Sequence, residues 1–154
     1  MIKVLFVCLG NICRSPMAEF VFKDMVKKRG LEKEFYIDSA ATEGYNESVR
    51  EGMYYETKNI LDEMHIPYTE HYSKQIRKED YEKYDYILGM EEKNIKNILR
   101  IVGNDSQNKV HRLLDFSPKP RDIIDPWYYG NFDSVYYDIV YGCEEFLKYL
   151  GFEK

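Results

Sequence analysis

Apolar positions along the chain group into short runs that alternate with longer stretches in which they recur every three or four residues. The first run, IKVLFV at 2–7, is rich in β-branched and aromatic residues and indicates a buried strand. The expected strands are 2–7, 35–39, 84–89 and 110–114, and the expected helices are 16–29, 47–64, 91–102 and 132–150. This alternation predicts an α/β fold with a parallel sheet.

Residues suited to chemistry are expected where these strands end. In an open parallel sheet, ligands bind outside the carboxyl ends of the strands. The positions at such ends are Cys8, Ser39, Met90 and the loop after Leu114. We therefore expect the functional site at this edge of the sheet.

The segment VCLGNICRSPMAE at 7–19 joins the first strand to the first helix. It places Cys8 and Arg14 six positions apart around a short glycine-containing turn, and Pro16 suits a first helical turn. Such a loop can turn its backbone N–H groups inward, with the positive end of the helix dipole behind them. The GxxxxGK[ST] pattern of nucleotide-binding loops is absent. The segment therefore predicts an anion site with a cysteine at its base.

These residue types suit phosphoryl transfer. The planar fork of Arg14 and the loop amides can hold the oxygens of a phosphate monoester. Amides, a guanidinium and a helix N-terminus favour the thiolate form of Cys8, which is the nucleophilic form. Ser15 can donate to that thiolate, and Asn11 suits a left-handed or bridging backbone position. A buried strand cysteine beside an ordinary arginine is the alternative, and the placement of Gly, Asn, Arg, Ser and Pro argues against it.

Composition narrows the function classes. The length of 154 residues suits one domain, 1–154, and the net charge of −5 opposes binding to nucleic acid or an anionic membrane. The N-terminal apolar run is too short for a secretory signal, and three cysteines do not suggest a disulfide scaffold. His65, His71 and His111 lack metal-ligand spacing. We expect a cytoplasmic protein that needs no metal.

Five blocks of the chain carry a resemblance to a known family. CLGNICRSPMAE resembles the signature of the low-molecular-weight protein tyrosine phosphatases. Further blocks follow in the family's order: DSAATEGYN at 38–46, EHYSKQI at 70–76, EDYEKYDYILGMEEKN at 79–94 and DPWYYGNF at 125–132. The resemblance implies one domain with a four-stranded, flavodoxin-like parallel sheet of order 2-1-3-4 and helices on both faces.

The resemblance also implies an activity, which is hydrolysis of phosphotyrosine in proteins, and of small aryl phosphates, through a cysteinyl-phosphate. Cys8 is the expected nucleophile, and Arg14 binds the phosphate. Asp125, which precedes Pro126, is the expected general acid and base, with Asp122 as the fallback. The expected phosphate-binding residues are Leu9, Gly10, Asn11, Ile12, Cys13, Arg14 and Ser15. No cofactor is implied, and a monomer is favoured.

Supporting roles follow from the same resemblance. Ser39 and His71 match a hydrogen-bond network that holds Asn11 and Ser15. Glu91 stands where many members have Asp, near the general acid, which leaves its effect on that acid open.

The resemblance further implies a substrate pocket and a redox partner for Cys8. The expected pocket walls are Leu9, Ile12, Tyr45, Trp127 and Tyr128, although Tyr45 or Trp127 can instead belong to the core. Cys13 is expected to form a reversible disulfide with Cys8, and the alternative is simple packing under the loop.

Three other functions compete with this prediction. A protein-arginine phosphatase tends to carry Thr where this chain has Ile12, so the bulky residue favours phosphotyrosine. An arsenate reductase relays oxidation through downstream cysteines, and no cysteine lies between Cys13 and Cys143. An idle phosphate-binding protein generally loses the nucleophile or the acid, and this chain keeps both.

Overall fold

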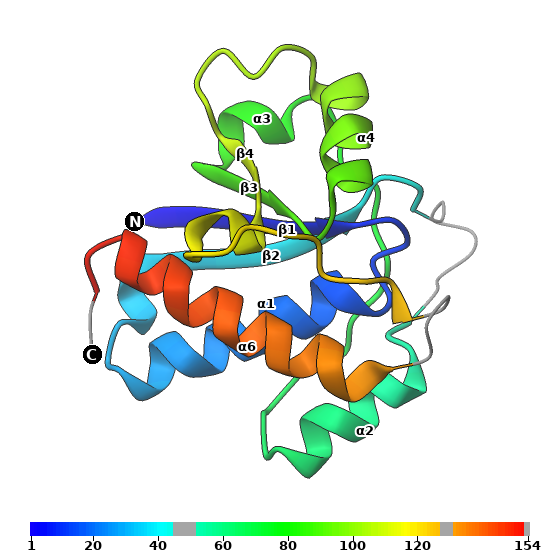
Figure 1. Ribbon diagram of the computed structural model, residues 1–154, viewed down its shortest axis with the longest axis vertical. Coiled ribbons are helices and arrows are strands. Elements are labelled where there is room, and N and C mark those ends of the chain that lie inside the picture. Colours follow the sequence, from blue (N-terminus) through cyan, green and yellow to red (C-terminus); the bar gives the residue numbers. More distant parts are fainter. Residues whose placement is uncertain (45–51, 127–130, 153–154) are drawn as a thin grey trace.

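A computed structural model describes residues 1–44, 52–126 and 131–152 and places four parallel strands in one sheet. The strands are β1 (Ile2–Cys8), β2 (Phe35–Ala41), β3 (Tyr86–Gly89) and β4 (Val110–Arg112). Their order is β2-β1-β3-β4, which confirms the expected order 2-1-3-4 (Figure 1).

The central strand β1 sets the position of Cys8. It pairs with β2 from Ile2 opposite Phe35 to Cys8 opposite Ala41, and with β3 up to Val7 opposite Gly89. Residues 4–8 are all buried, as expected for a strand covered on both faces. Cys8 is therefore the last residue of a central strand, at the edge of the sheet where the chain turns into the next helix.

Helices cover both faces of the sheet, as Figure 1 shows. On one side lie α1 (Arg14–Lys28), α2 (Tyr55–Glu63) and α6 (Phe132–Tyr149), and on the other lie α3 (Asp80–Lys83) and α4 (Glu92–Val102). Alternate residues of β1 point to opposite faces. Phe6 packs with Phe22 and Phe146 in the first core, whereas Leu5 packs with Ile98 in the second.

Two short 3₁₀ helices complete the described elements, η1 (Glu32–Glu34) and η2 (Leu113–Phe116). The expected strand 110–114 therefore ends early, at Arg112. The carboxylate of Asp115 accepts hydrogen bonds from the backbone N and the Nε of Arg112, both at 2.9 Å, and these contacts close the turn. The strand prediction was wrong at this end because a local side-chain turn replaces the last strand residues.

Other boundaries differ from the expected ones. The helix expected at 16–29 begins at Arg14, so that Pro16 lies in the first turn, where a missing N–H costs nothing. The helix expected at 47–64 begins at Tyr55, after Gly52 pairs with Tyr72 in an isolated bridge. Ser39 lies inside β2 rather than at its end, because the strand continues to Ala41.

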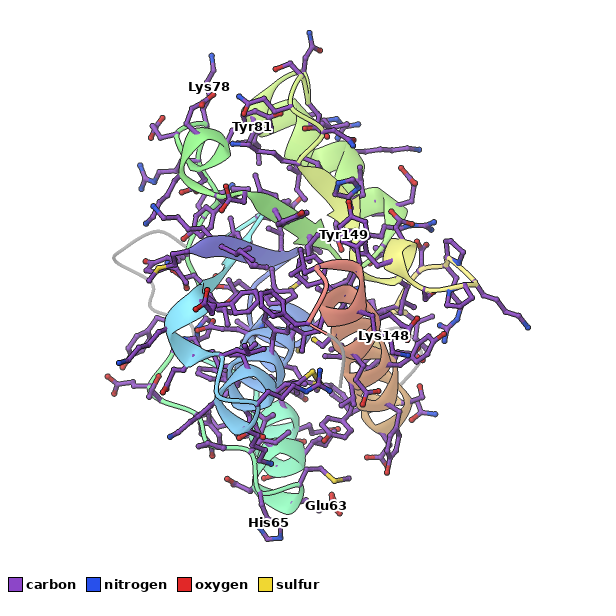
Figure 2. The ribbon with its side chains drawn as sticks, turned by 90° about the vertical axis from the view of Figure 1, so that its left-hand side faces the viewer. Glu63, His65, Lys78, Tyr81, Lys148 and Tyr149 are labelled. Atoms are coloured by element: carbon purple, nitrogen blue, oxygen red, sulfur yellow. The ribbon has the colours of Figure 1, made fainter. Side chains whose placement is uncertain are left out.

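Figure 2 shows the side chains around this frame and places Glu63 and His65 at the opposite end of the molecule from Lys78 and Tyr81. Within residues 1–44, 52–126 and 131–152, no helix has the length and apolarity that a bilayer crossing demands.

Candidate active site

The β1–α1 loop, residues 9–13, wraps around the sulfur of Cys8. The backbone N–H groups of Asn11 and Ser15 point at Cys8 Sγ, with N···S distances of 3.3 and 3.4 Å. The hydroxyl of Ser15 lies 3.1 Å from the same sulfur. Two backbone N–H groups and one hydroxyl thus converge on Cys8 at the N-terminus of α1, an arrangement that can stabilise negative charge on the sulfur.

Asn11 gives the loop its shape. Its φ of 57° is left-handed, as expected from the sequence. Its side-chain Nδ2 donates to Ser15 Oγ at 2.8 Å, and its Oδ1 accepts from the backbone N of Lys74 at 3.2 Å. The residue is fully buried. Asn11 therefore ties the loop to Ser15 on one side and to the chain at 74 on the other.

A buried carboxylate links the supporting residues. His71 Nε2 donates to the carbonyl oxygen of Asn11 at 3.0 Å, and His71 Nδ1 lies 3.9 Å from Glu19 Oε1. Ser39 Oγ donates to the same Glu19 oxygen at 2.6 Å. Glu19 is only 4% exposed. Ser39 therefore contacts Glu19, and Glu19 and His71 connect it to Asn11.

Glu19 and Ser73 were not expected at the site from the sequence. Glu19 follows Ser15 by one helical turn within the segment at 7–19. An acidic residue on the same side of the helix as Ser15 could have indicated a role at the site. Ser73 Oγ donates to the carbonyl oxygen of Gly10 at 2.8 Å, and no local pattern marked it.

Arg14 is 2% exposed and is held by three oxygen atoms. One terminal nitrogen donates to the carbonyl oxygen of Ile123 at 2.8 Å and lies 2.7 Å from Glu91 Oε2. The other lies 3.5 Å from Asp125 Oδ2. Glu91 was expected near the general acid, and the structure also places it directly against Arg14. These three contacts fix the guanidinium at the edge of the loop.

These groups surround a pocket of about 250 Å³, called here the Cys8 pocket. Its lining residues are Cys8, Leu9, Gly10, Ile12, Cys13, Arg14, Glu43 and Asp125. Asp125, which is far from the loop in sequence, therefore faces the same space as Cys8 and Arg14. Glu43 is an addition that the sequence analysis did not predict.

Asp122, the fallback acid, is engaged elsewhere. Its Oδ1 accepts from the backbone N of Glu92 at 2.9 Å and from Arg112 at 3.0 Å. It lines a neighbouring hollow of about 190 Å³. These contacts favour Asp125 over Asp122 for any role at Cys8.

The remaining expected residues differ in what the structure says of them. Tyr45, Trp127 and Tyr128 lie outside the described residues. Cys13 is buried and precedes α1, and neither Cys13 nor Cys8 is in a disulfide. In the described parts of the chain, no group of three His, Cys, Asp or Glu side chains could hold a metal ion.

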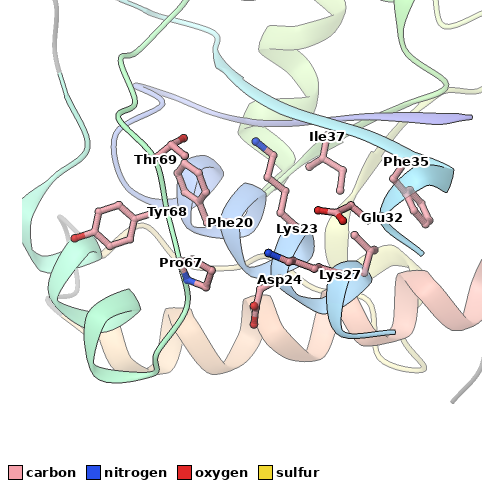
Figure 3. Close-up of a pocket in the computed structure, with 11 residues that line it drawn as sticks. Phe20, Lys23, Asp24, Lys27, Glu32, Phe35, Ile37, Pro67, Tyr68 and Thr69 are labelled. Atoms are coloured by element: carbon pink, nitrogen blue, oxygen red, sulfur yellow. The ribbon is translucent and has the colours of Figure 1, made fainter. Parts of the chain in front are cut away.

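A second pocket, of about 360 Å³, lies beside α1 (Figure 3). This α1 pocket is lined by Phe20, Lys23, Asp24, Val26, Lys27, Glu32, Phe35, Ile37, Pro67, Tyr68 and Thr69. Lys23 pairs with Glu19 at 2.5 Å, and Asp24 pairs with Lys28 at 2.9 Å. The lining is largely apolar, and two of its charged side chains are satisfied along the helix.

Comparisons with known proteins agree with this geometry. Residues 3–154 match the family described as low molecular weight phosphotyrosine protein phosphatase. YfkJ of Bacillus subtilis, called a low molecular weight protein-tyrosine-phosphatase, is 39% identical over 158 residues, which cover 100% of this chain and 99% of YfkJ. The human low molecular weight phosphotyrosine protein phosphatase is 39% identical over 151 residues, or 95% of this chain and 94% of the human one.

Solved structures give the same result. The crystal structure of YfkJ superposes with a TM-score of 0.92 at 38% identity, covering 98% of this chain and 95% of that chain. The YwlE arginine phosphatase, in a Cys-to-Ser variant with a phosphorylated active-site serine, matches with a TM-score of 0.83 at 26% identity, covering 97% and 96% of the two chains. On the family match and these relatives, the chain belongs to the low molecular weight phosphotyrosine protein phosphatase family.

Proposed function

We propose that this protein hydrolyses phosphotyrosine monoesters in proteins, and small aryl phosphates, through a phosphocysteine intermediate on Cys8. The observation that carries the proposal is the convergence of two backbone N–H groups and one hydroxyl on Cys8 Sγ, within 3.4 Å, inside a pocket shared with Arg14 and Asp125. A thiolate surrounded by donors, beside a fixed guanidinium, is suited to attack phosphorus.

In the first step, Cys8 Sγ attacks phosphorus in line, so that the S–P bond forms as the bond to the phenolic oxygen breaks. Arg14 and the loop amides hold the three equatorial oxygens. Asp125 gives its proton to the leaving oxygen. The phosphorylated serine that replaces cysteine in the YwlE structure supports a covalent intermediate at this position.

In the second step, water attacks the phosphocysteine and the thiolate leaves. Asp125, now ionised, takes a proton from the water. The hydroxyl of Ser15 and the amides of Asn11 and Ser15 stabilise the departing sulfur, because they already point at it. Phosphate is then released. Each step uses groups of this chain.

Within this mechanism, Glu91 and Glu19 act through other residues. Glu91 holds the guanidinium of Arg14 at 2.7 Å, and Glu19 holds Ser39 and His71 behind the loop. Each carboxylate holds a residue of the site in place, and neither needs to touch the phosphate.

The similarity to an arginine phosphatase raises a second candidate substrate, phosphoarginine. Ile12 lines the Cys8 pocket and offers an apolar wall. Such a wall favours an aryl ring over the polar phosphoguanidinium group. We therefore propose phosphotyrosine as the preferred substrate. We also propose a cytoplasmic setting, because reducing conditions keep a nucleophilic thiol such as that of Cys8 active.

The test is metal-free hydrolysis of matched peptides that carry phosphotyrosine, phosphoserine or phosphoarginine. Wild-type protein should release phosphate rapidly from the phosphotyrosine peptide alone. Cys8→Ser should lower kcat by roughly 10⁴-fold or more, because a serine hydroxyl is a much weaker nucleophile than a thiolate, and should still bind phosphate. Preference for phosphoarginine would contradict the inference that the apolar side chain of Ile12 favours phosphotyrosine. Binding of phosphate without turnover would indicate a binding protein.

A further inference from the structure

Glu43 is the carboxylate of the Cys8 pocket that the mechanism above leaves without a role. It lines the pocket together with Cys8, Arg14 and Asp125. Glu43 is exposed, whereas the carboxylates of Glu91 and Asp125 lie against Arg14. Among the residues that the structure describes, no cation pairs with Glu43 and no donor bonds its side chain.

The backbone around Glu43 is held in place on both sides. The backbone N of Thr42 donates to the carbonyl oxygen of Cys8 at 3.0 Å, and the backbone N of Glu43 donates to that of Leu9 at 2.8 Å. These two bonds lay residues 42 and 43 along the β1–α1 loop. The backbone of Glu43 therefore lies directly beside the anion-binding loop.

Gln75 fixes the same segment from its other side. Its Nε2 donates to the carbonyl oxygen of Thr42 at 2.9 Å, and its Oε1 accepts from the backbone N of Gly44 at 2.7 Å. A Cβ at Gly44 would lie 2.9 Å from the backbone N of Gln75, so the close approach requires glycine. The position of the Glu43 backbone is thus preorganised.

A carboxylate beside this pocket that pairs with no described residue has an electrostatic consequence. The phosphate of a phosphotyrosine carries up to two negative charges, and Glu43 repels it. A cation carried by the substrate would remove that repulsion and gain an ion pair. An acidic substrate residue at the same place would add to the repulsion.

From this geometry we propose that Glu43 selects phosphotyrosine sites with a lysine or arginine next to the phosphotyrosine. The side-chain carboxylate pairs with the ammonium or guanidinium group of that neighbour while the phosphate occupies the β1–α1 loop. The inference rests on the proposed phosphotyrosine activity and names the class of phosphoprotein that the same site prefers. Because the pair is solvent-exposed, its contribution is modest and falls with added salt.

The experiment uses the full chain and peptides that differ only in one residue flanking the phosphotyrosine, which is Arg, Ala or Glu. Wild-type protein should show a kcat/KM about fivefold higher for the Arg peptide than for the Glu peptide, because one exposed ion pair contributes about this much. The difference should appear in KM rather than in kcat. Glu43→Gln should bring the three peptides within about twofold of one another. The wild-type preference should shrink in 0.5 M NaCl, where screening is strong.

The matched control is Glu63→Gln, which removes the same charge at the far end of α2 (Figure 2). It should keep the wild-type preference for the Arg peptide. If Glu43→Gln kept that preference too, the proposal would be overturned. A lower kcat on all peptides and on p-nitrophenyl phosphate, without a change in preference, would instead assign Glu43 to proton transfer and also overturn it.

The outcome remains distinct from a failure of the proposed function. If the enzyme lacks phosphotyrosine activity, none of the three peptides will be hydrolysed in a Cys8-dependent way. If only the inference about Glu43 is wrong, all three will be hydrolysed at similar rates.

Discussion

The Cys8 pocket and the α1 pocket show how differently two hollows of one small protein are built. The α1 pocket is the larger, about 360 Å³ against about 250 Å³, and its walls are mostly apolar side chains. The Cys8 pocket has a floor of backbone N–H groups, a buried arginine and two carboxylates. The proposed chemistry is therefore assigned to the pocket with converging polar groups, not to the larger and more apolar one.

The two pockets are nevertheless linked by a chain of side-chain contacts through Glu19 and His71. Lys23 lines the α1 pocket and pairs with Glu19, which in turn bonds Ser39 and faces His71. The ring of Phe20, also in the α1 pocket, packs edge-on against His71 with ring centroids 6.2 Å apart. Residues of the α1 pocket thus support the residues that hold the Cys8 loop, and substitutions can separate support from catalysis.

After Cys8→Ser, the largest effect is expected at the polar pocket, from Asp125→Ala. Without a proton donor, phenolate departure should slow, and kcat for phosphotyrosine should fall by roughly 10²- to 10³-fold. The loss should be smaller for an aryl phosphate with a better leaving group, such as p-nitrophenyl phosphate. Steady-state kinetics on both substrates measure this difference.

Asp122→Asn is the control for that experiment, since Asp122 bonds Arg112 and the backbone of Glu92. Its kcat should stay within a few-fold of wild type. An unchanged rate for Asp125→Ala, or an equal loss in Asp122→Asn, would refute the assignment of the acid.

A smaller effect is expected from Glu19→Gln, at the contacts that link the two pockets. Loss of the carboxylate weakens its contacts with Ser39 and His71, so the loop carbonyl of Asn11 is held less firmly, and kcat should fall about tenfold. Lys23→Met is the matched control, because it removes the α1-pocket partner of the same carboxylate. It should change kcat little. A drop in melting temperature without a change in kcat would make Glu19 purely structural.

At the apolar pocket, Phe35→Leu should affect stability alone. Phe35 is buried and packs edge-on against Phe22 with ring centroids 5.3 Å apart. Its replacement should lower the free energy of unfolding by about 1.5 kcal/mol, because ring contacts are lost and a small cavity remains. Urea unfolding measures this change. A fall in kcat as large as that in Glu19→Gln would show that the two pockets are not separable.

The smallest effect is expected at a site remote from both pockets, at Asp105. Partial burial raises the pKa of Asp105, but hydrogen bonds from the Tyr81 hydroxyl and the backbone amides of Lys109 and Val110 outweigh it, so the pKa is lowered overall. A lowered pKa stabilises the fold above the pKa of the unfolded carboxyl, about 3.9, and this stabilisation is lost as the pH falls through the folded pKa.

Asp105→Asn should therefore lower the free energy of unfolding by about 1 kcal/mol at pH 7, and the difference from wild type should shrink below about pH 4. Urea unfolding at several pH values measures it, with Glu63→Gln as the exposed control. The same difference at pH 7 and at low pH would show that the charge on Asp105 does not stabilise the fold.

Much of the fold and part of the site were accessible from local pattern. The buried run before Cys8, the turn with Asn11 and the helix with Pro16 lie within about fifteen residues, and each depends on intrinsic backbone preference. The sheet order came from resemblance to a family, because periodicity alone does not order strands. The pairing of Asp125 with Cys8 likewise came from that resemblance, and the structure places both in one pocket.

The sequence by itself determined the α/β alternation and the strand–loop–helix unit that surrounds Cys8, since these depend on neighbours in the chain. Only the tertiary structure decided that Glu91 holds Arg14, that Glu19 joins Ser39 to His71, and that Glu43 faces the pocket. Those contacts join segments separated by twenty or more residues. Which of many polar side chains meet across such separations depends on how strands and helices pack, and no local pattern records that.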